Sequence, residues 1–494
     1  MYLWIVIIGG IFSFFAATGI GANDTANAFS TSIGSKSLTI KQAVVLASIF
    51  ETSGAILMGS RVSETIRKGI ADYECFTDDS YALMYGCMWV IFSVGLWLFL
   101  ASYFEMPVST THSCVGGMIG MTWALKGRDC VIWYKAVDTF PWVGGVSGII
   151  LSWFISPLFS AIISMILFST IREFILRKNF NKKRIYYLYP VLIGTTISLN
   201  CFFIIYKGAK GIGLDDINAS YAILISLGSG IVSGVSILPF LPKISNYIEN
   251  KFSIQNDNEE CESKNKINHS LNKINPIGIS IGFNSKNEKN KVENIHSSAE
   301  KFDPRTEEFF KYLQIFTAIC DSFSHGANDV ANAIGPFAAI LTIYKYDIVT
   351  EKSAMDDDGW WILGLGGIGI TLGLILYGYK IINAIGVKLC KITPSRGAII
   401  ELSSATIIII GSRLNIPLST THCQIGSTVG VGLLEDYKNI TGINKNIFIK
   451  TIFGWIITCF VVGFSTAIFT LQGVHAPKLF ENNTDFLLIN NTYH

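Results

Sequence analysis

The sequence predicts an all-α polytopic membrane protein with about 12 transmembrane segments, arranged as two inverted repeats that contain broken helices or re-entrant hairpins. Three observations support this fold class. Half of the 494 residues are hydrophobic and 15% are charged, with a mean hydropathy of +0.44, which is too apolar for a soluble chain of this length. Apolar stretches of roughly 20 residues, enough to cross a bilayer, recur along the chain. Two polar motifs each occur twice.

Apolar runs define the individual segments. All of them are expected to be helices, because an open strand edge cannot satisfy its backbone in lipid. The first run is expected to be a retained helix and not a cleaved signal peptide, since no basic residue precedes it. Uninterrupted runs cover 2–20, 42–60, 83–104, 140–168, 187–206, 220–240, 360–382, 398–412 and 450–471, and polar residues interrupt the runs at 107–125, 311–345 and 417–434.

A change in composition divides the chain. Between residues 243 and 308 the apolar pattern stops and Asn, Lys, Glu and Ser dominate. Such a segment cannot bury enough apolar surface to offset its ordering entropy. The predicted organisation is an N-terminal membrane repeat with connecting helices (1–242), a disordered cytoplasmic loop (243–308), a C-terminal membrane repeat (309–475) and an extracellular tail (476–494). A regulatory or trafficking role for the loop stays open.

Loop charges predict the orientation of the two repeats. The basic stretch at 172–186 favours the cytoplasmic side, and the loop at 243–308 then lies on that side too. The segment that enters the second repeat therefore runs outward, toward acidic residues at 347–358. The matching loop of the first repeat carries Lys36 and Lys41, so its helix runs inward. Inverted repeats of this kind are typical of secondary transporters with a midplane site and alternating access.

The same topology places both termini outside the cell. Glycosylation sequons at Asn218, Asn482 and Asn490 fall on predicted extracellular segments, although a further one at Asn268 falls in the predicted cytoplasmic loop. The ten cysteines are scattered and contain no Cys-x-x-Cys pair, so they are predicted to be packing residues and not a disulfide or zinc framework. Only Cys75 and Cys87 suggest a bridge. The net charge of +2 indicates no nucleic-acid partner.

Two duplicated motifs place polar residues in apolar surroundings. Gly21–Ala28 (GANDTANA) recurs as Gly326–Ala333 (GANDVANA), and Pro107–His112 (PVSTTH) recurs as Pro417–His422 (PLSTTH). Carboxylates, amides and hydroxyls inside membrane segments are costly unless they bind something. Their duplication indicates a transporter.

The Asn-Asp motif suits a cation. On a helix, the side chains of Asn23, Asp24 and Asn27 cover neighbouring parts of one face, and the same spacing recurs in the second copy. Carboxylate and amide oxygens are ligands for small hard cations, of which sodium is the natural candidate. Gly21 and Gly326 are expected to let each helix unwind and present free carbonyls. The alternative is that these residues only hold helices together by hydrogen bonds.

The Ser-Thr-Thr motif suits an anion. Pro107 and Pro417 fit the first turn of a helix, and the hydroxyls that follow would lie where free N–H groups and the positive dipole end attract an anion. Two such helix starts, facing each other from inverted repeats, could surround a tetrahedral oxyanion such as phosphate or sulfate. The alternative is that the hydroxyls bond their own helix backbone.

Two glutamates also lie in apolar runs. Glu51 precedes Arg61, and Glu401 precedes Arg413, in similar surroundings, so the two glutamates are interpreted as a pair across the halves. The arginines are expected to snorkel to the interface. The glutamates are candidate cation ligands or proton carriers, with a structural ion pair as the alternative. Membrane carboxylates with no motif lysine or arginine beside them imply that bound cations neutralise an anionic substrate.

These motifs, together with Ser32–Lys36 (SIGSK) and with His325 before the second copy, resemble the inorganic phosphate transporter family of sodium–phosphate symporters. The resemblance covers roughly residues 5–125 and 310–470. It implies cation-coupled symport of inorganic phosphate across the plasma membrane, with sodium as the coupling ion. It also implies an integral membrane homodimer that is not an enzyme and has no other cofactor or metal.

The resemblance also assigns roles to residues. It implies that Asp24, Asp329, Glu51, Glu401 and His325 are needed for transport, the four carboxylates as sodium ligands together with Asn23 and Asn328. The implied phosphate-site residues are Asn23, Asn27, Asn328, Asn332, Ser109, Thr110, Thr111, Ser419, Thr420 and Thr421. His112 and His422 stay open between substrate contact and tertiary hydrogen bonding. Because His325 corresponds to Ile20, the two halves cannot contribute equally.

Other functions remain open from the sequence. A proton-coupled phosphate or sulfate permease fits the same motifs. An anion channel or a membrane scaffold is a different class, and the four membrane carboxylates argue against a pure anion pore. A metalloenzyme that uses His325, His112 and His422 lacks ligands at a spacing such as His-x-x-x-His.

Overall fold

The computed structural model describes residues 2–138, 142–178, 182–205, 217–262, 286–347, 349, 359–414, 416, 418–435 and 442–475. These residues are mostly helical. The strands within them are β1 (Lys135–Ala136) and β2 (Val143–Gly144), which pair antiparallel in a short hairpin. Each apolar run read from the sequence contains a helix.

The first polar motif interrupts the helix that opens the N-terminal half. This helix, α1 (Leu3–Ile20), continues into the π-helical turn η1 (Gly21–Thr25), and a turn at Phe29 separates α2 (Ala26–Ala28) from α3 (Ser30–Gly34). The remaining elements of this half are α4 (Ile40–Lys68), η2 (Tyr73–Phe76), α5 (Ser80–Tyr103), α6 (Thr110–Lys126), η3 (Arg128–Cys130), α7 (Gly145–Ile171) and η4 (Arg172–Leu176).

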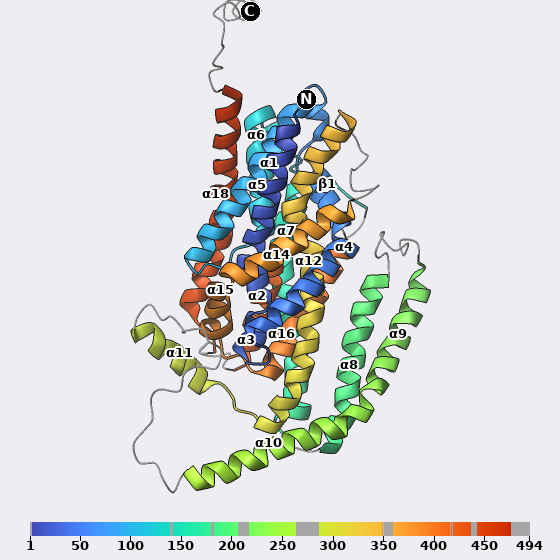
Figure 1. The fold of residues 1–494 in the computed structure, drawn as a ribbon, viewed down its shortest axis with the longest axis vertical. Helices are drawn as coiled ribbons and strands as arrows, with labels where there is room; N and C mark the ends of the chain where they lie inside the picture. Colours follow the sequence, from blue (N-terminus) through green and yellow to red (C-terminus); the bar gives the residue numbers. More distant parts are fainter. Residues whose placement is uncertain are drawn as a thin grey trace, which may run out of the picture.

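The second polar motif lies in the longest helix, which is continuous. This helix, α12, covers Pro304–Tyr346 and runs in the opposite direction to α1 (Figure 1). The elements that follow it are α14 (Trp360–Tyr377), α15 (Tyr379–Asn383), η7 (Ala384–Leu389), α16 (Pro394–Arg413), α17 (Thr420–Leu433) and α18 (Lys445–His475).

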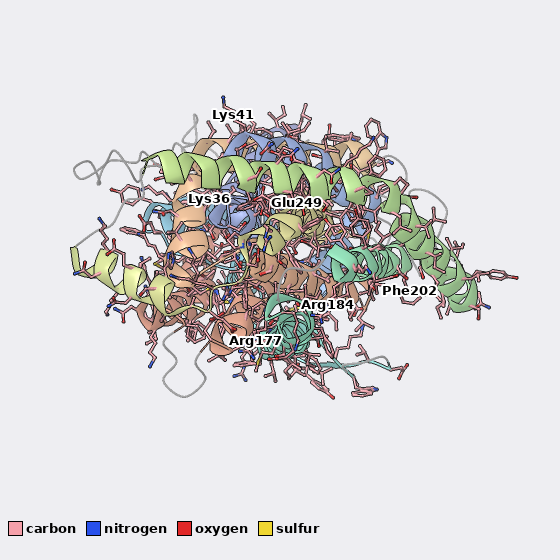
Figure 2. The ribbon with its side chains drawn as sticks, turned by 90° about the horizontal axis from the view of Figure 1, so that it is seen from below. Lys36, Lys41, Arg177, Arg184, Phe202 and Glu249 are labelled. Carbon is pink, nitrogen blue, oxygen red and sulfur yellow. A yellow bond between two sulfur atoms is a disulfide. The ribbon has the colours of Figure 1, made fainter. Side chains whose placement is uncertain are left out.

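Helices α8 (Lys182–Ile205) and α9 (Ala219–Ser236) pack together through facing glycines, since a Cβ at Gly230 would collide with the backbone of Gly194. The turn η6 (Leu238–Phe240) then leads into α10 (Leu241–Glu262), which lies across one end of the bundle (Figures 1 and 2).

The structure corrects the prediction of disorder for residues 243–262 and 286–298. Helices α10 and α11 (Lys286–Ser298) cover these residues. Helix α10 buries Leu241, Ser245 and Ile248, a helical spacing that gives this polar segment one packed face. Residues 263–285 lie outside the described residues, as does the tail after residue 475.

Seven helices in the described part of the chain are long and apolar enough to cross a membrane. Large apolar side chains cover their outer surfaces, for example Phe154, Phe460 and Phe464 at 70–72% exposure. Such exposure suits lipid and not water. The chain is therefore an integral multi-pass membrane protein, and the total of about 12 segments stays a prediction.

Close helix contacts join the two halves in a matched way. A Cβ at Gly326 of α12 would strike the backbone of Glu51 in α4, and a Cβ at Gly21 would strike the backbone of Ile370 in α14. Both glycines therefore permit close packing. The expectation that both glycines unwind their helices is wrong, because Gly326 lies within a continuous α-helix and Gly21 begins a π-helical turn.

A disulfide joins Cys75 to Cys130, which are separated by 55 residues. It corrects the expectation that all cysteines are packing residues and the suggestion of a Cys75–Cys87 pair, since Cys87 is free and buried. The bridge forms because the segments after α4 and α6 meet, as the pairing of Ala71 with Val131 also indicates.

Candidate functional site

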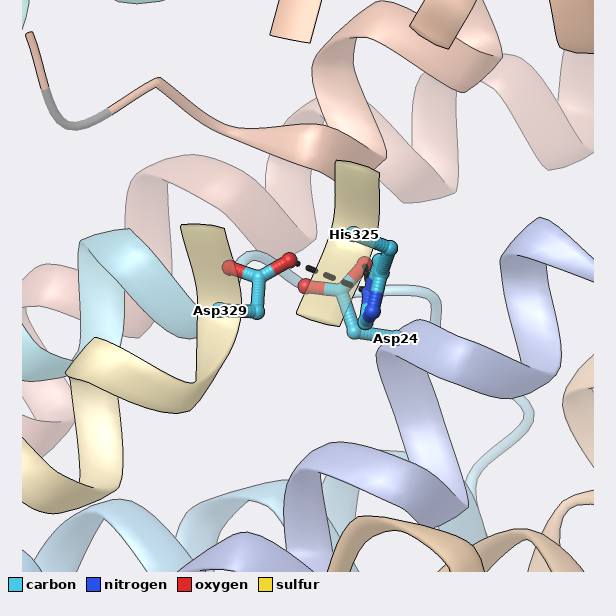
Figure 3. Close-up of side chains that lie close together, drawn as sticks. All are labelled: Asp24, His325 and Asp329. Atoms are coloured by element: carbon cyan, nitrogen blue, oxygen red, sulfur yellow. Dashed lines mark ion pairs between the residues drawn. The ribbon is translucent and has the colours of Figure 1, made fainter. Parts of the chain in front are cut away.

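Two aspartates and a histidine from the two halves meet in the interior (Figure 3). Asp24 lies in η1, and His325 and Asp329 lie one turn apart on α12. All are at most 1% exposed, and each offers a ligand atom within 4.8 Å of the others. His325 Nε2 lies 3.0 Å from Asp329 Oδ2 and 3.8 Å from Asp24 Oδ1. This group of atoms can hold a metal cation.

Threonine hydroxyls at the starts of α6 and α17 bridge the two carboxylates. Thr110 Oγ1 lies 3.0 Å from Asp24 Oδ2 and 2.9 Å from Asp329 Oδ1. Thr421 donates to Asp24 Oδ1 at 2.6 Å, and Thr420 donates to Asp329 Oδ2. Each half of the chain therefore contributes hydroxyls to both aspartates.

The first turns of α6 and α17 are built alike. Ser109 and Ser419 are the N-caps, whose hydroxyls accept from His112 N at 3.3 Å and His422 N at 3.2 Å. Each helix therefore begins after its proline, and the placement of Pro107 in a first turn is wrong. Pro417 lies outside the described residues.

The starts of these two helices also bond to one another. Thr111 Oγ1 donates to Leu418 O at 2.9 Å, and Thr421 Oγ1 donates to Val108 O at 3.1 Å. The positive ends of two helix dipoles are thereby held near the aspartates, with Thr110 N 3.5 Å from Asp24 Oδ2. Such donors can bind an oxyanion where cations offset the aspartate charges.

The motif asparagines divide into two kinds. Asn23 Nδ2 donates to Met106 O at 3.0 Å, and Asn328 Nδ2 donates to Leu418 O at 3.0 Å, so each fixes the segment before a threonine motif. Asn332 Nδ2 donates to Asp329 Oδ1 at 2.8 Å. The Oδ1 atoms of Asn27 and Asn332 are buried without a hydrogen-bond partner, which leaves them able to contact a ligand.

The two glutamates occupy different surroundings. Glu51 Oε2 lies 2.9 Å from His325 Nδ1, whereas Glu401 accepts from Thr317 at 2.6 Å. Gly326 packs against the backbone of Glu51, and its counterpart Gly21 packs against the backbone of Ile370. The position that matches Glu51 in the other half is therefore Ile370 and not Glu401. The interpretation of the glutamates as a pair across the halves is therefore wrong, and the sequence similarity around them does not reflect a shared position. The side chains of Arg61 and Arg413 lie outside the described residues.

His112 and His422 make tertiary contacts away from the carboxylates. The His112 ring lies 3.6 Å from the ring of Trp153, and the His422 ring lies 3.7 Å from that of Trp455, measured between centroids. His112 Nδ1 lies 3.0 Å from Trp455 O, and His422 Nδ1 lies 2.9 Å from Trp153 O. These contacts favour the tertiary hydrogen bonding considered for both histidines, and a need for them in transport stays a prediction.

Sequence reasoning missed a set of polar residues beside the aspartates. Asp321, Ser404 and Gln424 line a small pocket together with Asp24, Asn27, Ala28, His325, Ile408 and Thr420. Asp321 could have been identified from the sequence, because a carboxylate inside a membrane segment is by itself a candidate functional residue.

Comparisons with known proteins found a family model, relatives and a solved structure to which this chain is similar. The model of the "phosphate transporter family" matches residues 20–466. A "putative phosphate permease" of Haemophilus influenzae is 31% identical over 92% of this chain and 93% of its own. "Sodium-dependent phosphate transporter 1" of Mus musculus is 28% identical over 94% of each chain. A solved structure of "the sodium-dependent phosphate transporter" is similar with a TM-score of 0.74 and 29% identity, over 96% of this chain and all of the other.

Proposed function

Because the chain belongs to the phosphate transporter family, we propose that it carries inorganic phosphate across the plasma membrane together with sodium, by alternating access. The observation that carries this proposal is the meeting of Asp24 and Asp329 with the starts of α6 and α17. Carboxylates suit cations and helix N-termini suit oxyanions, so one enclosed site offers both kinds of ligand. The sodium-dependent relatives support the choice of ion.

Charge balance supports coupling to a cation. Asp24, Asp329, Glu51 and Glu401 are fully or almost fully buried. Among the described residues, the ion pairs of these four carboxylates are made by His325 alone. Bringing phosphate to such a site adds more negative charge where charge is already costly. Bound sodium ions remove this cost, which makes phosphate binding depend on sodium.

We assign the cation ligands to Asp24, Asp329, Glu51 and Glu401 with Asn23 and Asn328. The phosphate ligands are the asparagines and the hydroxyls of the two motifs. Thr110, Thr420 and Thr421 now bond the aspartates. When sodium binds the carboxylates, it competes for the oxygens that these hydroxyls contact, and the hydroxyls become available to phosphate.

Alternating access would follow from an inverted relation between the halves. The opposite directions of α1 and α12 support this relation, as do the matched contacts Thr111 to Leu418 and Thr421 to Val108. A site between two such halves can open to either side when one half tilts against the other.

The proposed orientation places both termini outside. The ring of Tyr2 contacts the ring of Tyr81, and the Tyr81 hydroxyl donates to Asp347, so the N-terminus, the segment after Cys75 and the end of α12 lie together. Disulfides persist in oxidising compartments, so the end near the Cys75–Cys130 bridge is assigned to the outside. The opposite end carries Lys36, Lys41, Arg177 and Arg184 (Figure 2), which suits the cytoplasm.

Reconstitution into liposomes tests the function. Uptake of labelled phosphate is measured under a sodium gradient, under a proton gradient and under neither, with sulfate as competitor. Saturable uptake driven by the sodium gradient is expected. Uptake driven only by protons, or strong competition by sulfate, would favour the permease alternatives. Conduction without any gradient of sodium or protons would favour a channel, and no phosphate movement at all would leave only a scaffold.

A further inference from the structure

We propose that Asp321, Asn27, Ser404 and Gln424 form a separate sodium site beside the Asp24–His325–Asp329 cluster. The site is defined by its own residues, and only its part in a transport cycle rests on the proposed function. The four residues line one pocket. They come from both halves of the chain, since Asn27 lies in α2 and the others lie in α12, α16 and α17.

Several acceptor oxygens of this pocket are buried and without hydrogen-bond partners. Asp321 and Gln424 are 2% exposed, and Asn27 and Ser404 are 1% exposed. Three acceptor oxygens lack a partner in the structure, namely Asp321 Oδ1, Asn27 Oδ1 and Gln424 Oε1. The Ser404 hydroxyl interacts with Asp321. Buried polar atoms are normally satisfied. A set of unpartnered atoms around one pocket therefore indicates a ligand.

Glu401 shows how this protein satisfies a buried carboxylate by itself. Its oxygens accept from four side chains at 2.5–3.1 Å, those of Thr31, Ser32, Gln314 and Thr317. Asp321 is buried to a similar degree, yet one of its oxygens has no donor. An unpaired buried carboxylate is costly, so Asp321 needs positive charge from elsewhere.

The nearest histidine is shared with other carboxylates. His325 lies one turn after Asp321 on α12, but its ring nitrogens lie 2.9 Å from Glu51 and 3.0 Å from Asp329. His325 and the Ser404 hydroxyl favour the charged form of Asp321, whereas Glu401 and Glu51 add negative charge around it. The local field therefore attracts a cation from solution.

The donor set favours sodium over a proton or a divalent ion. A proton on Asp321 would create one donor, and the acceptors of Asn27 and Gln424 would not all be satisfied by it. A cation satisfies all of them at once. Hard oxygen ligands select hard cations, and one carboxylate among neutral oxygens matches a single positive charge. The occupant is therefore a monovalent hard cation.

This site would connect moving parts near the proposed phosphate position. Gln424 lies one turn after Thr420 on α17, and Asn27 lies near Asp24. An ion held by α2, α12, α16 and α17 would join the two halves and place a positive charge beside Thr420. Sodium at Asp321 would thus favour the closed arrangement in which both threonine motifs meet.

Equilibrium binding of radioactive sodium to the purified protein, without phosphate, tests the site. Asp321→Asn removes the charge with little change of shape, and Gln424→Met removes the amide at similar volume. We expect Asp321→Asn to bind about one sodium fewer per chain. We expect Gln424→Met to weaken one binding event about tenfold, equivalent to about 1.4 kcal/mol. Asp347→Asn is the matched control, since this residue lies at the exposed end of α12 and its positive φ suits asparagine.

The outcomes separate the site from the proposed function. Sodium binding equal to that of the wild type in both folded variants, or no sodium binding by the wild type, would overturn the site. The wild type could bind sodium without taking up phosphate. If Asp321→Asn then loses one bound sodium, the result supports the site and overturns the proposed function. Size-exclusion profiles and unfolding temperatures check that each variant folds. If Asp321→Asn does not fold, sodium binding to Gln424→Met tests the site.

Discussion

The two copies of the Asn-Asp motif share their residues and differ in their surroundings. In the first copy the helix changes to a π-helical turn at Gly21–Thr25, whereas α12 is continuous through the second copy. Asp24 and Asp329 both accept from threonines of both halves. Only Asp329 has a histidine one turn before it, because the position of His325 is occupied by Ile20 in the first copy.

This difference teaches that two copies with the same carboxylates can differ in the titratable group beside them. His325 lies between Glu51 and Asp329, so the second copy carries a chain of titratable groups that the first copy lacks. Asp321, one further turn back on α12, extends this inequality. The predictions below compare the two copies, beginning with the largest expected effect on uptake.

Removing either aspartate charge should abolish transport. Asp24→Asn and Asp329→Asn should each lower sodium-dependent phosphate uptake at least about a hundredfold, equivalent to about 2.7 kcal/mol, because each variant removes a charge that attracts sodium. Uptake into proteoliposomes measures this. If one variant kept normal uptake, the two copies would not share one site.

Changing the histidine should separate the copies. His325→Gln should lower uptake about tenfold, equivalent to about 1.4 kcal/mol, because Glu51 and Asp329 lose their shared partner. The conservative change Ile20→Val at the matching position should leave uptake within about twofold, since Ile20 only packs in the core. Equal losses of uptake in both variants would show that the difference between His325 and Ile20 does not affect transport.

The N-caps should behave alike in both halves. Ser109→Ala and Ser419→Ala should each lower the stability of the folded protein by about 1 kcal/mol, because each serine satisfies one N–H at the start of its helix. Thermal unfolding in detergent, with uptake measured in parallel, gives both effects. A loss of uptake larger than the loss of stability, in both variants, would support the proposed contact of these serines with phosphate, and such a loss in one variant alone would show that the two N-caps are not equivalent.

Breaking the disulfide should have the smallest effect on uptake. Cys75→Ser with Cys130→Ser removes the bridge between segments that lie away from the carboxylate cluster. Stability should fall by about 2–4 kcal/mol, with uptake near normal where the protein folds. In the wild type on cells, an impermeant thiol reagent should label these cysteines only after external reduction. Labelling that needs permeabilised cells would reverse the proposed orientation.

The positions of the helices and the central residues of the site could be predicted from the sequence, because both follow from local patterns. Apolar runs decide which segments are helical, and the motif spacing puts Asn, Asp and Thr side chains on common faces. Features that depend on contacts between distant segments could not be predicted in this way. The Cys75–Cys130 bridge depends on two segments meeting, and the true counterpart of Glu51 is Ile370, a match visible only through the packing of Gly326 and Gly21. Asp321 was missed because it lies outside the duplicated motifs.

The most direct test of the central claim measures phosphate binding to the purified protein, with and without sodium. If the aspartates of the two copies hold the cations that make room for an oxyanion, phosphate should bind in sodium and not in a large organic cation such as choline, and Asp24→Asn should lose the sodium effect. Phosphate binding of equal strength in both salts would contradict the account.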